Sequence, residues 1–166
     1  YYSRARNILK SAVLIKSEFK SKLPTSIEEL VSLPGIGRST AGAIRSIGHG
    51  LKAPILDGNV KRVLSRYFKI EEELSKSSTQ KQLWLLAEKV LQKSNFNIHT
   101  QAIMDLGALV CKKKNPTCFS CPQNKHCLAN KYALTASIPT KIKRKEKPQK
   151  TLYWLVAMDK EGRFAL

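Results

Sequence analysis

Four cysteines lie close together in the sequence, at a spacing from which thiolates can bind metal. They are separated by six, two and five residues and are Cys111, Cys118, Cys121 and Cys127. Sulfur ligands this close in sequence can converge on one centre without the rest of the fold bringing them together. We favour an iron–sulfur cluster. Zinc is an alternative, although structural zinc sites usually contain two tight pairs and only Cys118 and Cys121 form one here. Disulfides would suit a secreted peptide better than this basic chain.

A glycine-containing turn, Leu33-Pro34-Gly35-Ile36-Gly37-Arg38-Ser39-Thr40, is a second candidate for function. Gly35 and Gly37 lack a Cβ, so their backbone can approach a phosphate closely. The helix expected after the turn begins with unpaired N–H groups, which favour the same ligand. Arg38 and Thr40 can add side-chain contacts. Such contacts hold the sugar-phosphate chain without selecting a base sequence. An ordinary turn would explain a lone Pro-Gly-x-Gly equally well.

The charge balance favours a polyanionic partner. Thirty Lys and Arg residues face twelve Asp and Glu residues, which gives a net charge of +18 and a pI near 10.0. Nucleic acid is favoured over a membrane because the basic residues are spread along the chain, with no long apolar segment or lipidation signal beside them. A basic surface that is simply solvated is the alternative. No signal peptide opens the chain, so an intracellular protein is expected. The ends at Tyr1 and Leu166 suggest a segment of a longer protein.

Helices are expected to position these groups, since apolar residues recur at helical spacing up to about residue 110 and no strand is evident. The first helix is predicted to carry its apolar stripe on Ala5, Ile8, Leu9, Ala12, Val13 and Phe19. Ser26 with Glu29, and Thr79 with Gln82, have the form of capping boxes. Asp57 is expected to cap a helix that follows Asp57-Gly58-Asn59. Two further helices are expected over residues 39–47 and 102–110, the second running up to Cys111.

The character of the chain changes after the cysteines. Residues 141–150 contain six Lys or Arg residues and one Glu, which is typical of a solvated linker. Residues 151–158 are apolar and β-prone, a turn follows, and residues 163–166 resume as a second strand. A β-containing domain is therefore expected to begin near residue 151.

The cysteine intervals, the glycine turn and the segment around Asp57 together resemble the endonuclease III superfamily, and the likeness is closest to the bacterial adenine DNA glycosylases. It covers roughly residues 1–130 and is carried by residues 1–7, 37–43, 55–63 and 101–108. The resemblance implies an all-α helix-hairpin-helix glycosylase fold. It divides the chain into a helical barrel domain (1–94), an iron–sulfur cluster lobe (95–130), a basic linker (131–150) and the first strands of a truncated α/β Nudix-like domain (151–166).

The resemblance also implies roles for individual residues. The four cysteines would hold a 4Fe-4S cluster, and Asp57 would be the essential carboxylate that stabilises positive charge on a sugar as a base leaves. His126 stays unassigned. The residues expected to contact DNA are Tyr1, Tyr2, Arg4, Gly35, Ile36, Gly37, Arg38, Ser39, Thr40, Asn59, Lys61, Arg62, Lys112 and Lys113.

The implied activity is hydrolysis of the N-glycosidic bond of adenine mispaired with 8-oxoguanine or guanine in double-stranded DNA. Ser39 stands where bifunctional relatives have the lysine that forms a Schiff base, so strand cleavage is not expected. The family's general-acid glutamate would precede Tyr1, and the segment alone is therefore expected to be inactive. We expect a monomeric, cytoplasmic bacterial protein associated with the nucleoid. The alternatives are a bifunctional endonuclease III-type enzyme and a non-catalytic helix-hairpin-helix module.

Overall fold

The computed structural model describes residues 2–140, 149–153, 155, 157–158 and 160–163, and over these residues its regular elements are helical. Tyr1, residues 141–148 of the predicted linker, and residues 154, 156, 159 and 164–166 of the predicted strands lie outside the described residues. The elements are α1 (Tyr2–Glu18), α2 (Ile27–Ser32), α3 (Arg38–Ala43), the π-helical turn η1 (Ile44–Gly48), α4 (Gly58–Tyr67), α5 (Ser77–Lys89), α6 (Phe96–Asp105), the π-helical turn η2 (Leu106–Val110), the 3-10 turns η3 (Cys118–Ser120) and η4 (Asn124–His126), and α7 (Leu128–Lys131).

Two of the three predicted helix starts are confirmed. The Glu29 N–H donates to Ser26 Oγ at 3.1 Å, and the Val60 N–H donates to Asp57 Oδ1 at 2.7 Å, as caps require. The predicted box of Thr79 and Gln82 is wrong. Helix α5 begins at Ser77, and the Thr79 side chain is buried within it, only 2% exposed, so it cannot serve as an exposed cap.

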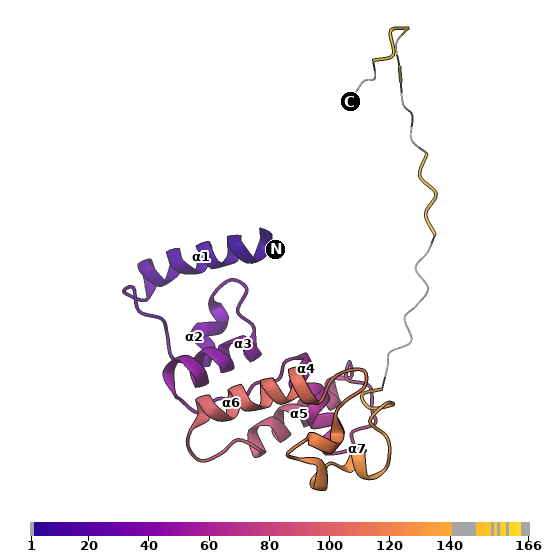
Figure 1. Ribbon diagram of the computed structural model, residues 1–166. Helices are drawn as coiled ribbons and strands as arrows, with labels where there is room; N and C mark the ends of the chain where they lie inside the picture. Colours follow the sequence, from indigo (N-terminus) through magenta and orange to yellow (C-terminus); the bar gives the residue numbers. More distant parts are fainter. Residues whose placement is uncertain (1, 141–148, 154, 156, 159, 164–166) are drawn as a thin grey trace.

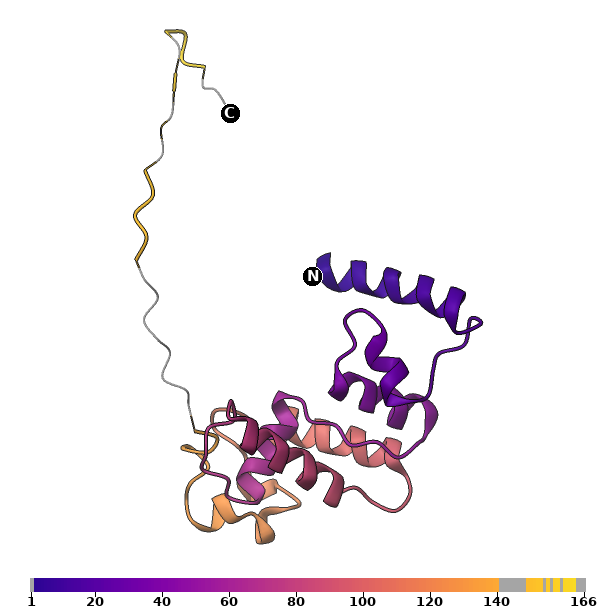
Figure 2. The same ribbon diagram turned by 180° about the vertical axis from the view of Figure 1, so that it is seen from behind.

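The helices form two packed groups (Figures 1 and 2). In the first, α2 and α3 pack together and bury Leu30, Leu33 and Ala41, with part of α1 against them. The second contains α4, α5 and the segment that leads into α4. Its buried residues are Ile55, Leu56, Val60, Leu64, Ile70, Leu83 and Ala87. Helix α6 packs on both η1 and α4, and so joins the two groups.

The apolar stripe predicted for α1 is only partly the face that packs. Ile8, Leu9 and Val13 are 60–68% exposed over the described structure. Phe19, which belongs to the predicted stripe, does pack on α2 and α3, but its partners there are Leu14 and Ile15, which the prediction left out. Helical spacing thus predicted the helix correctly, but not which apolar residues contact the described neighbours.

No strand is present in the part of residues 149–163 that the structure describes, where Met158 forms only an isolated bridge. The Nudix-like start stays a prediction. Among the described residues, no helix has the length and apolarity needed to cross a bilayer.

Candidate active site and cysteine cavity

The glycine turn is held against α1 at its first glycine. Gly35 has a φ of +81°, and a Cβ there would lie 2.9 Å from Asn7 Nδ2. The Ser11 hydroxyl donates to the Pro34 carbonyl at 3.0 Å. Gly37 then precedes α3, and a Cβ at this position would meet open space. The turn is therefore fixed from behind and open at the start of α3, as an approaching phosphate requires.

The side chains around the turn differ in their exposure. The Arg38 guanidinium carbon lies 4.0 Å from the centroid of the Trp84 ring, a cation–π contact that holds an exposed cation in place. Thr40 is exposed, whereas Ile36 is half-buried and packs on the α2–α3 core. Tyr2, at 84% exposure, and Arg4 lie on the exposed surface of α1.

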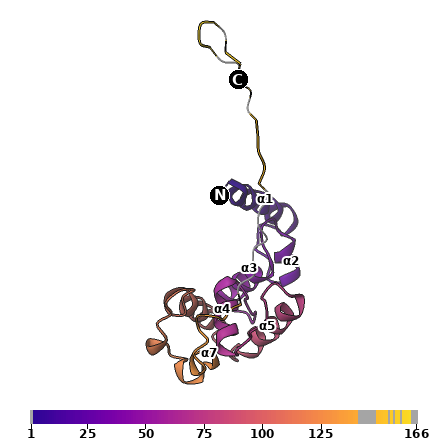
Figure 3. The same ribbon diagram turned by 90° about the vertical axis from the view of Figure 1, so that its right-hand side faces the viewer.

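Helix α3 contacts the segment that leads into Asp57. The Leu56 N–H donates to Ser39 Oγ at 3.0 Å. A Cβ at Gly42 would lie 2.2 Å from the Pro54 carbonyl oxygen, so only glycine permits this approach. The hairpin and the chain that positions the aspartate are consequently joined by these contacts. Figure 3 shows α3 between α1 and α4 along the molecule.

Asp57 is half-buried at the start of α4, with an extended backbone at φ −82° and ψ −178°. One carboxylate oxygen, Oδ1, caps the helix. No described residue donates a hydrogen bond to the other oxygen. The cap orients the carboxylate while its second oxygen remains available to a substrate.

Asn59 and Arg62 form an internal link rather than an exposed surface. Arg62 donates to the carbonyls of Cys111 (2.7 Å) and Gly107 (2.6 Å), and to Asn59 Oδ1 (2.9 Å). A Cβ at Gly107 would lie 2.8 Å from the Asn59 Cβ, so η2 lies directly against the start of α4. This network joins helix α4, which begins after Asp57, to the first cysteine. Lys61, on the same helix, is half-buried, and its ammonium has no partner among the described residues.

The four cysteines are unpaired and half-buried, and all four line one small cavity together with Arg66. Burial raises the pKa of the Cys118 thiol, and the neighbouring Cys111 and Cys127 raise it further. Burial likewise raises the pKa of Cys127. Within the described residues, no three His, Cys, Asp or Glu side chains are spaced to hold a single metal ion. The donor set, four thiols facing one cavity, fits a group that takes sulfur ligands.

The loop between the first two cysteines presents positive charge. The side chains of Lys112 and Lys113 are exposed, while their carbonyl oxygens accept hydrogen bonds from Arg66 at 2.7 and 3.4 Å. Arg66 was not predicted as a functional residue. Its signal in the sequence is an arginine on the buried side of α4, three residues after the buried Val63.

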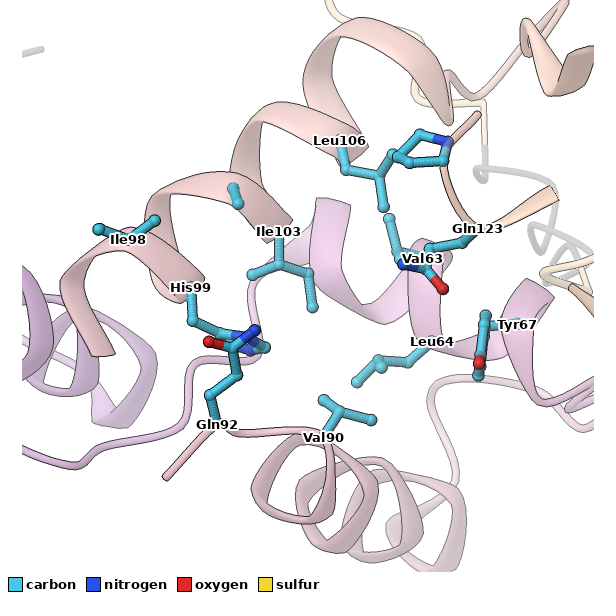
Figure 4. A pocket seen from close by; sticks show the side chains of 12 residues that line it. Val63, Leu64, Tyr67, Val90, Gln92, Ile98, His99, Ile103, Leu106 and Gln123 are labelled. Atoms are coloured by element: carbon cyan, nitrogen blue, oxygen red, sulfur yellow. The ribbon is translucent and has the colours of Figure 1, made fainter. Parts of the chain in front are cut away.

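A larger cavity of about 400 Å³ lies between α4, α6 and the end of α5 (Figure 4). Val63, Tyr67 and Ile103 are among its mostly apolar lining, and Asp57 is not part of it. His99 also lines this cavity, and burial lowers its pKa. This cavity is therefore separate from the site that contains the carboxylate.

Comparison with known proteins shows what this chain is similar to. A helix-hairpin-helix motif model matches residues 18–47. The chain is 43% identical over 164 residues to the adenine DNA glycosylase of Buchnera aphidicola subsp. Schizaphis graminum. The alignment covers 99% of this chain and 47% of that protein. The chain is thus similar in sequence to adenine DNA glycosylases over nearly its whole length. It is also 40% identical over 130 residues to the human adenine DNA glycosylase, which covers 78% of this chain and 24% of the human protein.

The chain spans about half the length of the bacterial relatives that it matches. Two solved structures share its fold. A thermostable thymine-DNA glycosylase has a TM-score of 0.67 at 27% identity and covers 78% of this chain and 59% of that chain. A trapped endonuclease III–DNA covalent intermediate has a TM-score of 0.65 at 28% identity. The match covers 80% of this chain and 60% of that chain. The predicted helix-hairpin-helix motif and the endonuclease III-like helical fold are thus confirmed.

Proposed function

We propose that the full-length protein is a monofunctional DNA glycosylase that hydrolyses the N-glycosidic bond of adenine mispaired with 8-oxoguanine or guanine. One observation carries this proposal. The Asp57 carboxylate caps α4 through one oxygen, and the residue before it is bound by Ser39 of the hairpin helix. An element suited to hold a phosphate backbone thereby sets the position of a carboxylate that has a free oxygen. The adenine DNA glycosylases that the chain matches support the choice of base.

The chemistry follows from this placement. A base inside a duplex must be rotated out before its sugar bond can react. As adenine leaves, positive charge develops on the deoxyribose, and a carboxylate opposite C1′ lowers the free energy of that state. Because Asp57 is already oriented by its helix cap, it does not need to reorganise during the reaction. Water then attacks the sugar cation.

Ser39 makes hydrolysis without strand cleavage the expected outcome. A hydroxyl cannot form a Schiff base with the sugar, and Ser39 Oγ already accepts a hydrogen bond from the Leu56 N–H. Protonation of the departing adenine is assigned to a glutamate that precedes Tyr1 in the family. We therefore propose that residues 1–166 alone bind DNA but release no adenine.

We propose that Cys111, Cys118, Cys121 and Cys127 hold a 4Fe-4S cluster. When bound, the cluster supplies a covalent cross-link of the loop rather than hydrolytic chemistry. Four thiols that face one cavity support this assignment, as does the endonuclease III-like fold. Their raised pKa values mean that Cys118 and Cys127 favour the neutral thiol until a metal group stabilises the thiolate.

The DNA path that we propose runs over the exposed face of the hairpin and the basic cysteine loop. Arg38 and Thr40 contact the backbone beside the flipped nucleotide, Lys61 contacts it next to Asp57, and Lys112 with Lys113 extend the positive surface. Tyr1, Tyr2 and Arg4 stay assigned to DNA, as do the glycines of the turn. We also propose the domain division given above, in which a Nudix-like domain that begins near residue 151 recognises the lesion. We propose that the protein is a monomer and acts on the bacterial chromosome in the cytoplasm.

The test uses full-length protein purified anaerobically and a duplex with one adenine opposite 8-oxoguanine. Free adenine should appear in the supernatant, and the strand should break only after alkali. Strand cleavage without alkali would support the bifunctional alternative, and tight binding without adenine release the non-catalytic one. The same preparation should be brown, with absorbance near 400 nm and about four irons per chain. A colourless zinc protein would contradict the cluster.

A further inference from the structure

Arg66 is a buried cation beside the four cysteines. It lies on α4, is 2% exposed, and lines the cavity that the four cysteines share. Its guanidinium donates to the carbonyls of Ile138 (2.8 Å), Lys112 (2.7 Å) and Lys113 (3.4 Å). Arg66 thus joins α4 to the cysteine loop and to the chain after α7.

The charge of Arg66 has no carboxylate partner among the described residues. Carbonyl oxygens satisfy its N–H groups, but they do not neutralise a full charge in a buried site, where an uncompensated ion is costly. Two neighbouring residues, Lys112 and Lys113, add further positive charge at the surface. The site is therefore electrostatically unbalanced unless a negative group occupies the cavity.

The remaining contacts of Arg66 are with two of the cysteines. Its Nη1 lies 3.3 Å from Cys111 Sγ, and its carbonyl oxygen accepts from the Cys127 thiol at 3.6 Å. Four thiolates carry more negative charge than the core of a 4Fe-4S cluster cancels, so the loaded site is an anion beside a guanidinium. We propose that Arg66 is the internal cationic partner of the cysteine-held cluster, donating to the Cys111 sulfur and raising the reduction potential of the cluster. This rests on the cluster assigned above.

The sign of the effect follows from charge alone. Reduction adds one electron to a site that is already negative, and a neighbouring cation stabilises the more negative state. Hydrogen bonds to the sulfurs act in the same direction. Removal of Arg66 should therefore lower the reduction potential. A change of about tenfold in the ratio of reduced to oxidised cluster at a fixed potential corresponds to about 59 mV for one electron.

The experiment compares the full-length wild type with Arg66→Gln, Arg66→Lys and Arg45→Gln, each purified anaerobically. Arg45 is the matched control, because it also donates to backbone carbonyls, those of Thr25 and Lys52, but contacts no cysteine. Iron and acid-labile sulfide are measured per chain, and the potential is obtained by spectroelectrochemical titration. Arg66→Gln should retain the cluster, and its ratio of reduced to oxidised cluster at a fixed potential should fall about tenfold, which corresponds to a reduction potential lower by about 59 mV. The reduction potential should decrease less in Arg66→Lys and should not change in Arg45→Gln.

The outcomes separate the two proposals. A loaded Arg66→Gln protein with wild-type potential would overturn the role of Arg66 and leave the cluster intact. Wild-type protein without iron and sulfide would overturn the cluster and this inference with it. If Arg66→Gln does not fold, Arg66→Met takes its place, because it also removes the charge and the N–H donors but keeps an unbranched apolar stem. An unchanged potential in that variant overturns the inference, and a lowered one supports it.

Discussion

Asp57 can be tested so that its structural role and its chemical role are separated. Asp57→Asn retains an oxygen that can accept the Val60 N–H, because asparagine caps helices about as well as aspartate. Its free energy of unfolding should therefore stay within about 0.5 kcal/mol of the wild type. Asp57→Ala removes the acceptor and should lose about 1 kcal/mol. Only the alanine variant destabilises α4.

The two variants should be impaired alike in catalysis, because both lack the negative charge. Removal of one preorganised group that stabilises transition-state charge typically costs about 10²–10³ in rate, roughly 3–4 kcal/mol in the barrier. We expect adenine release to slow by at least that factor in each. Duplex affinity should change little, since the hairpin and the basic loop remain.

The assay is single-turnover adenine release by the full-length protein, combined with urea unfolding and fluorescence anisotropy on the same duplex. The asparagine variant is the decisive one. If it releases adenine within about threefold of the wild-type rate, less than 1 kcal/mol in the barrier, Asp57 is only a cap. If it is as unstable as the alanine variant, the described cap does not account for the stability of α4.

Other predictions concern the elements around the carboxylate. Ser39→Lys should introduce strand cleavage, and borohydride should trap a covalent protein–DNA complex; no trapped complex would contradict the position assigned to Ser39. Gly42→Ala should lose about 1–3 kcal/mol of unfolding free energy, since the new Cβ meets the Pro54 carbonyl at 2.2 Å, whereas Gly48→Ala meets open space and should lose less; equal losses would contradict the close approach. Burial lowers the pKa of His99 below its ordinary 6.5, so the folded state disfavours the charged ring. Stability should be complete above about pH 6.5 and should fall as the pH drops toward the lowered pKa, less so in His99→Gln; parallel pH profiles in chemical denaturation would contradict this.

The sequence predicted the local elements of the site well because each depends on nearby residues. Asp57 caps the helix that follows it, and Ser26 caps α2, since both contacts reach only three residues ahead. The glycine turn was likewise recognisable from its own residues. Thr79 was misassigned because burial against α5's neighbours, a tertiary effect, determines its environment.

Contacts between distant segments could not be predicted from local patterns. Arg62 donates to carbonyls 45 and 49 residues away, and its expected role in DNA binding gave no indication of these contacts. Arg66 contacts Ile138, 72 residues along the chain. Nothing in the spacing around either arginine indicates which carbonyls the fold will bring to it. The same holds for the apolar stripe of α1, since Ile8 and Leu9 remain exposed over the described structure.

The most direct measurement is a structure of the full-length protein on a duplex in which a cationic pyrrolidine replaces the sugar of the target adenosine. That ring imitates the charge that develops as the base leaves. We expect the ring nitrogen to lie within hydrogen-bond distance of the free Asp57 oxygen, with the adjacent phosphates at the start of α3. A pyrrolidine bound elsewhere, with Asp57 contacting only the α4 backbone, would contradict the assignment of this site as the glycosylase centre.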